Sequence, residues 1–159
     1  MTEVDIQDTL FEHLRAFNAF CFLNGYKGAP FFDPDSDTES GYKNVHFPNC
    51  KFTLPADGRW FDVMLLSNPP EPAGLSDFAQ NIYTGVLYID IYTPVDVGES
   101  EAVQKYIWIS RFFERGKDIG NGVDIQRCYL SNRGTQNGSY WIQAAVEWEA
   151  VGDKEKVDE

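Results

Sequence analysis

The segment NIYTGVLYIDIYTP, residues 81–94, constrains the fold more than any other stretch because it is apolar on both faces of a strand. A strand with one face in water alternates apolar and polar side chains. The two sets here are Tyr83, Leu87, Ile89 and Ile91 on one face, and Ile82, Val86, Tyr88 and Tyr92 on the other. Both faces therefore need cover. Either two helices of the chain cover one face each, or a neighbouring copy of the chain covers the second face.

Two stretches carry apolar residues at the spacing of a helical face. The first is residues 3–24, where Thr2 can cap the start and Gly25 can end the helix. The second is residues 99–115, which has arginines in its last turns and Gly116 directly after it. These two helices are the predicted helical layer.

Further strands are predicted at 59–67, 123–132 and 139–150. The last two are joined by the Gly- and Asn-rich hairpin turn RGTQNG, residues 133–138. The core face of the final strand is formed by Tyr140, Ile142, Ala144, Val146 and Trp148.

The connecting segments are rich in proline and glycine. Residues 25–58 hold only short extended pieces, because their prolines prevent a helix. Residues 68–80 are a long surface loop between two strong strands, and loops of that kind are often functional.

The order of elements predicts the fold class. It indicates an α+β fold: a single domain with a mostly antiparallel β-sheet, two α-helices packed on it, and extended loops. A chain of 159 residues suits one domain. We expect that domain to span 1–150, followed by a charged, flexible C-terminal tail at 151–159.

Composition excludes several classes of partner. The formal net charge of −12 argues against binding to the phosphate backbone of nucleic acid and against docking on anionic membranes. No apolar run approaches the ~20 residues that a membrane span needs. Three widely spaced cysteines, Cys21, Cys50 and Cys128, and a start without signal-peptide features favour a chain that stays in the reducing cytoplasm where it is made.

Signatures of catalysis are absent from the sequence. No phosphate-binding glycine loop, nucleophile elbow or HExxH pattern occurs. His13 and His46 are far apart in sequence, and His13 falls on the polar side of the first helix. Glu147 and Glu149 share a strand face about 7 Å apart, a spacing that could serve acid–base work but more often faces water or a partner. We expect no catalytic residue and no cofactor.

The stretch DPDSDTESGYKN, residues 33–44, partly resembles a calcium-binding loop. Asp33, Asp35 and Asp37 occupy the first three ligand positions. Thr38 stands where the sharp turn needs glycine, and Asn44 stands where the bidentate glutamate belongs. We therefore predict an acidic, solvated loop and no metal site.

Several motifs in one order carry a family resemblance. They are YKNVHF at 42–47, NPPEPAGLSDFAQNIYTGVLYIDIYTPVDVG at 68–98, FERG at 113–116, and the closing pair of strands that begins with GVDIQRC and ends with GSYWIQAAVEWEA. Together they resemble the tail terminator, or tail completion, proteins of long-tailed bacteriophages over about residues 3–150. The acidic insert at 33–41 departs from the family pattern.

The resemblance implies a structural protein of the virion. It implies a homo-oligomeric ring, a hexamer, that caps the head-proximal end of the tail tube, stops tube polymerisation and docks the head or neck. The implied partners are the tail tube protein and a head or neck connector protein. DNA would pass through the lumen without specific binding. Assembly would take place in the host cytoplasm, and no catalysis, cofactor or membrane is implied.

Four residues are the candidate partner interface: Leu75, Phe78, Tyr88 and Tyr92. Leu75 and Phe78 are apolar residues in a proline-stiffened loop, and stiffening lowers the ordering cost of binding. The alternative is that both pack on the protein's own core. Three other functions stay open: a head-side neck or connector protein, a small enzyme that uses surface carboxylates, and a small-ligand-binding α+β module.

Overall fold

A six-stranded sheet organises the molecule. The computed structural model describes residues 3–72 and 81–152. The strand order is β1-β2-β4-β6-β5, with β3 paired beside β4. Only the β1–β2 pair is parallel, so the predicted α+β class with a mostly antiparallel sheet is confirmed. The strands are β1 (Val45–His46), β2 (Trp60–Ser67), β3 (Glu71–Pro72), β4 (Asn81–Pro94), β5 (Val123–Gln136) and β6 (Ser139–Gly152).

The predicted helix 3–24 is present in two segments, α1 (Glu3–Arg15) and α2 (Phe17–Leu23). The chain bends at Ala16, whose N–H donates to the carbonyl of His13 three residues back and tightens the end of α1. Asn18 then fixes α2 in place by donating to the carbonyl of Phe32 at 2.7 Å and accepting its N–H at 3.1 Å. The second predicted helix is α3 (Ser100–Phe112), preceded by the short 3₁₀ turn η1 (Val95–Val97).

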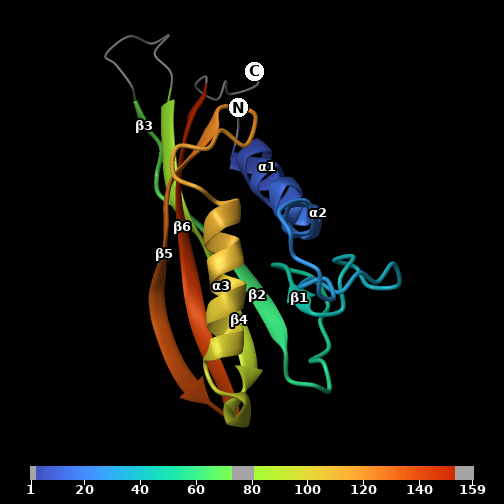
Figure 1. Ribbon diagram of the computed structural model, residues 1–159. Coiled ribbons are helices and arrows are strands. Elements are labelled where there is room, and N and C mark those ends of the chain that lie inside the picture. The colour runs from blue at the N-terminus through green and yellow to red at the C-terminus, as the bar shows by residue number, and fades with distance from the viewer. Residues whose placement is uncertain (1–2, 73–80, 153–159) are drawn as a thin grey trace.

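All helices cover the same face of the sheet. Figure 1 shows α3 lying along the front of the strands, with α1 and α2 beside it. Burial in β4 alternates, and every second residue from Tyr83 to Thr93 is buried in the core under the helices. The core face predicted for the final strand is also confirmed, since Ile142, Ala144 and Trp148 are buried. Of the two alternatives left open by the sequence, the one in which a helix covers each face is therefore wrong for the described residues.

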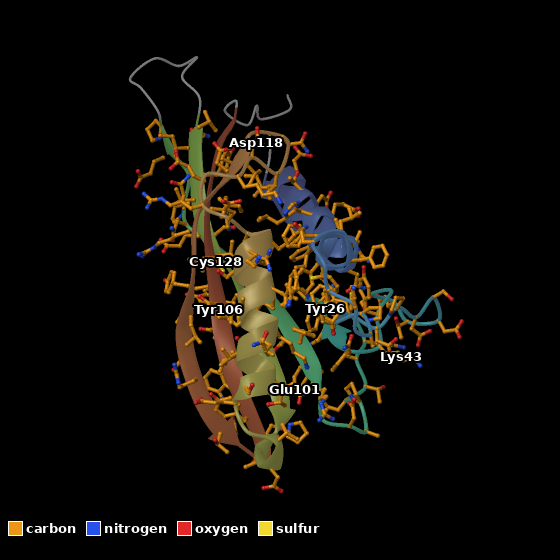
Figure 2. The ribbon with its side chains drawn as sticks, viewed as in Figure 1. Tyr26, Lys43, Glu101, Tyr106, Asp118 and Cys128 are labelled. Carbon is orange, nitrogen blue, oxygen red and sulfur yellow. The ribbon has the colours of Figure 1, made fainter. Side chains whose placement is uncertain are left out.

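The β5–β6 hairpin is longer than predicted. Residues 133–136, which the sequence assigned to the turn, continue β5 in register with β6. The turn itself is the pair Asn137–Gly138, with φ of 52° and 79°. An Asn-Gly pair suits a two-residue hairpin turn with positive φ at both positions, so the strands extend up to it. Figure 2 shows Tyr106 on the side of α3 that faces this hairpin, where Cys128 of β5 also lies.

His13, which the sequence pattern placed on the polar side of the first helix, has its imidazole half-buried between α1 and α3. The ring stacks on Phe112 with a centroid distance of 4.3 Å and meets Phe113 edge-on. Its Nε2 atom is buried with no hydrogen-bond partner. Burial, and secondly the Lys117 ammonium, lowers the pKa of His13 to about 4. The folded protein therefore holds the His13 imidazole in its neutral form.

Acid should weaken the folded protein through His13. The pKa of His13 is 6.5 in the unfolded chain and about 4 in the folded chain, so the folded protein takes up this proton only at lower pH. This contribution to stability is therefore complete above pH 6.5 and is lost as the pH falls towards 4. We expect wild type to lose about 2 kcal/mol more than His13→Phe over this range, measured by urea unfolding. Equal losses in the two proteins would contradict the assignment.

Candidate functional site

The second face of the sheet carries the candidate site. We call it the open sheet face, because the helices cover the other side (Figure 1). Side chains of paired strands that stand opposite each other share a face, so the register defines its rows. The open sheet face comprises Trp60, Asp62, Met64, Leu66, Val86, Tyr88, Asp90, Tyr92, Arg127, Tyr129, Trp141, Gln143, Ala145 and Glu147.

An aromatic row crosses one end of this face. Tyr92 stands between Trp60 and Trp141 in the register. The rings of Trp60 and Tyr92 stack at 4.1 Å with an interplanar angle of 4°. Trp141 lies over Gly134, where a Cβ atom would come within 3.0 Å of the indole. Three half-buried rings therefore form a flat, rigid surface.

A polar row lies next to the aromatic row. Asp90 stands opposite Asp62 on one side and Gln143 on the other. His46 Nδ1 lies 3.2 Å from Asp62 Oδ1, and Asp90 has one buried oxygen, Oδ1, with no hydrogen-bond partner. Burial raises the pKa of both carboxyls, and the neighbouring Asp62 raises that of Asp90 further. The row therefore holds two closely spaced acids, one of which has an unfilled acceptor.

Apolar side chains lie beyond the polar row. Tyr88 stands opposite Met64 and Ala145, and Val86 stands opposite Leu66. Met64 and Leu66 are exposed by 43% and 51%. Exposed apolar and aromatic side chains gathered on one face are typical of a protein-protein contact. The arrangement suits the binding of a folded partner.

The sequence-predicted site residues divide into two groups. Tyr88 and Tyr92 both lie on the open sheet face, in the apolar and aromatic rows. Leu75 and Phe78 lie outside the described residues. Sequence reasoning missed Trp60 and Asp62, because residues 60–66 are apolar on both strand faces apart from Asp62 and carry no alternation that separates the faces.

The acidic side chains singled out in the sequence have structural surroundings in the described residues. Glu147 pairs with Arg127 across β6 and β5. Within residues 3–72 and 81–152, no group of three or more His, Cys, Asp or Glu side chains is placed to hold a metal ion. Asn44 instead fixes the acidic loop, since its Oδ1 accepts the N–H of Asp33 and its Nδ2 donates to the carbonyl of Phe31, both at 2.8 Å. Among the described helices, none is long and apolar enough to span a membrane.

Comparisons with known proteins give one family. A family model described as phage tail terminator protein matches residues 39–148. No curated protein matches the sequence. Nineteen solved chains match in structure. One of them superimposes with a TM-score of 0.54 at 18% sequence identity, covering 74% of this chain and 83% of that one. At that identity the likeness concerns the fold alone.

Proposed function

Because the chain belongs to the phage tail terminator family, we propose that it caps the head-proximal end of the tail tube. In that position it stops further addition of tube protein and offers a docking surface to the head or neck. Proteins of this family are structural components of the phage tail. The proposed role needs contacts with neighbouring proteins and no catalytic group.

The open sheet face is the observation that carries the assembly part of the proposal. Its aromatic row, Trp60, Tyr92 and Trp141, is not covered by any helix within the described residues. A closed ring of identical subunits places one patch of each subunit against a different patch of its neighbour. We propose a hexameric ring in which this face becomes a subunit boundary.

The charge of the chain supports passage of DNA through such a ring. With a formal net charge of −12, the protein repels phosphate groups instead of binding them. DNA would then cross the lumen without a specific site. The proposed role has the protein at the head-proximal end of the virion tail, after assembly in the host cytoplasm.

The test adds purified protein to growing tail tubes. Its solution mass is measured by light scattering, alone and with tube protein, and tube length is followed by electron microscopy. We expect a ring, either in free solution or on tube ends, and an arrest of tube growth. Binding to filled heads without binding to tubes would instead favour a neck or connector protein. A monomer indifferent to both would overturn the proposal.

The segment 68–80 gives a sharper version of this test. Phe78→Asp should abolish joining to tubes, since it replaces an apolar contact by a charge that must be desolvated. Ser76→Asp adds the same charge two positions away and is the control, which should join normally. The readout is the fraction of capped tubes. Normal capping by Phe78→Asp would remove Phe78 from the interface.

A further inference from the structure

The polar row of the open sheet face gathers two carboxyl groups without an arginine or lysine paired to them in the described residues. Asp62 and Asp90 face each other across β2 and β4, and Asp90 Oδ1 is buried without a partner. They lie between the aromatic row at Tyr92 and the apolar row at Tyr88. Asp90 has a hydrogen bond from Gln143, and the Asp62 side chain, which is 31% exposed, is the part of the pair that an incoming donor can reach. An incoming cation that also stacks on aromatic rings fits this place, and arginine has both properties.

The opposite side of the protomer presents a donor without an acceptor. Among the arginines of the described residues, Arg111 and Arg115 have no carboxylate within salt-bridge distance, whereas the other four are paired. The exposed Arg111 lies over the Trp108 ring at 4.6 Å from its centroid, which holds the guanidinium in place on the surface of α3. Ile107 beside it is 41% exposed. The outer face of α3 therefore combines a fixed cation with an apolar side chain.

These two surfaces cannot meet within one molecule. The helix α3 packs on the covered side of the sheet (Figure 1), and Arg111 is an exposed residue of that helix, so it lies on the other side of the sheet from the open sheet face. A second copy is the occupant that supplies the charge, because each copy carries an acidic pair on one side of the sheet and an exposed, unpaired arginine on the other. Contact between two different patches is heterologous and propagates from copy to copy until a ring closes.

We propose that the outer face of α3 in one subunit docks on the open sheet face of the next, with Arg111 inserted between Tyr88 and Tyr92 against the Asp62–Asp90 pair. This inference rests on the proposed ring and names the surfaces that form it. Two carboxylates match the planar fork of a guanidinium, and the two tyrosines offer ring faces to it. The stacking on Trp108 lowers the ordering cost of the side chain.

Charge reversal tests the contact. Arg111→Glu should weaken self-association on tube ends about a hundredfold, because one charge-assisted contact is lost and like charges meet. Asp90→Arg should give the same loss, and the double variant Arg111→Glu with Asp90→Arg should restore assembly. Lys51→Glu changes the charge equally at an exposed position on another surface and is the control. Association is measured by sedimentation velocity and light scattering.

Two further measurements separate loss of folding from loss of assembly. Circular dichroism melts confirm that each variant is folded. If Asp90→Arg does not fold in its central strand, the neutral double variant Asp62→Asn with Asp90→Asn replaces it and should also lose assembly. If wild type forms rings and caps tubes but Arg111→Glu does so equally well, the docking inference is overturned and the proposed function stands. If wild type forms no ring with tube protein, both are overturned.

Discussion

Replacing Gly85 by alanine should destabilise the folded protein by about 3 kcal/mol. Gly85 lies in the middle of β4, between Ser67 of β2 and Trp148 of β6. A Cβ atom there would come within 2.2 Å of the backbone oxygen of Leu66 and 2.5 Å of the Trp148 indole. Neither neighbour can yield easily, because one is the backbone of the paired strand and the other is a buried ring. The strands would have to separate, or Trp148 would have to leave the core.

A matched glycine on the other face is the control. Gly134→Ala brings a Cβ atom within 3.0 Å of Trp141, but this indole lies on the open sheet face and is only half-buried. A shift of the ring by a few tenths of an ångström relieves the contact, so we expect a loss below about 1 kcal/mol. Urea unfolding measures both variants. A loss for Gly85→Ala no larger than for Gly134→Ala would show that β2 and β4 are not as closely paired as described.

The four long strands and the two helical stretches could be predicted from periodicity, but the break at Ala16 and the short strand β3, which lies inside the predicted loop 68–80, could not. The apolar spacing from Ile6 to Cys21 runs through it without interruption. The bend depends on Asn18, which binds the backbone of Phe32 in a distant loop. Tertiary contacts of this kind override a local helical signal and do not change the spacing of the apolar residues, so the sequence pattern does not reveal them.

The candidate site was only partly visible in the sequence. The apolar pattern of 81–94 predicted that Tyr88 and Tyr92 need cover, and both lie on the open sheet face. The face that the helices cover could not be predicted from the sequence, because both faces of the strand are apolar. It also could not pair Asp62 with Asp90, since they meet only through the register of β2 and β4. The acid pair is therefore a product of the fold.

A second large loss of stability is expected for Glu101→Gln, about 2 kcal/mol after allowance for its partial exposure. Glu101 of α3, labelled in Figure 2, accepts two hydrogen bonds from Arg59, at 2.5 and 3.3 Å, and one from Lys105 at 3.4 Å. Lys105 is only 9% exposed, and its ammonium lies over the Phe61 ring. Burial lowers the pKa of Lys105, which shows that its charge depends on the carboxylate beside it. The neutral amide leaves that buried charge without a counter-ion.

The pH dependence and a rescue distinguish this cause from a general packing defect. Hydrogen bonds from Arg59 lower the pKa of Glu101 below its usual 4.5. The advantage of wild type over Glu101→Gln should therefore be complete above pH 4.5 and shrink as acid protonates the carboxylate. Lys105→Met, added to Glu101→Gln, removes the buried charge and packs an apolar side chain on Phe61. The double variant should therefore recover most of the stability lost in Glu101→Gln. Failure of the double variant to recover would mean that Glu101 acts mainly through Arg59, which joins the start of β2 to α3.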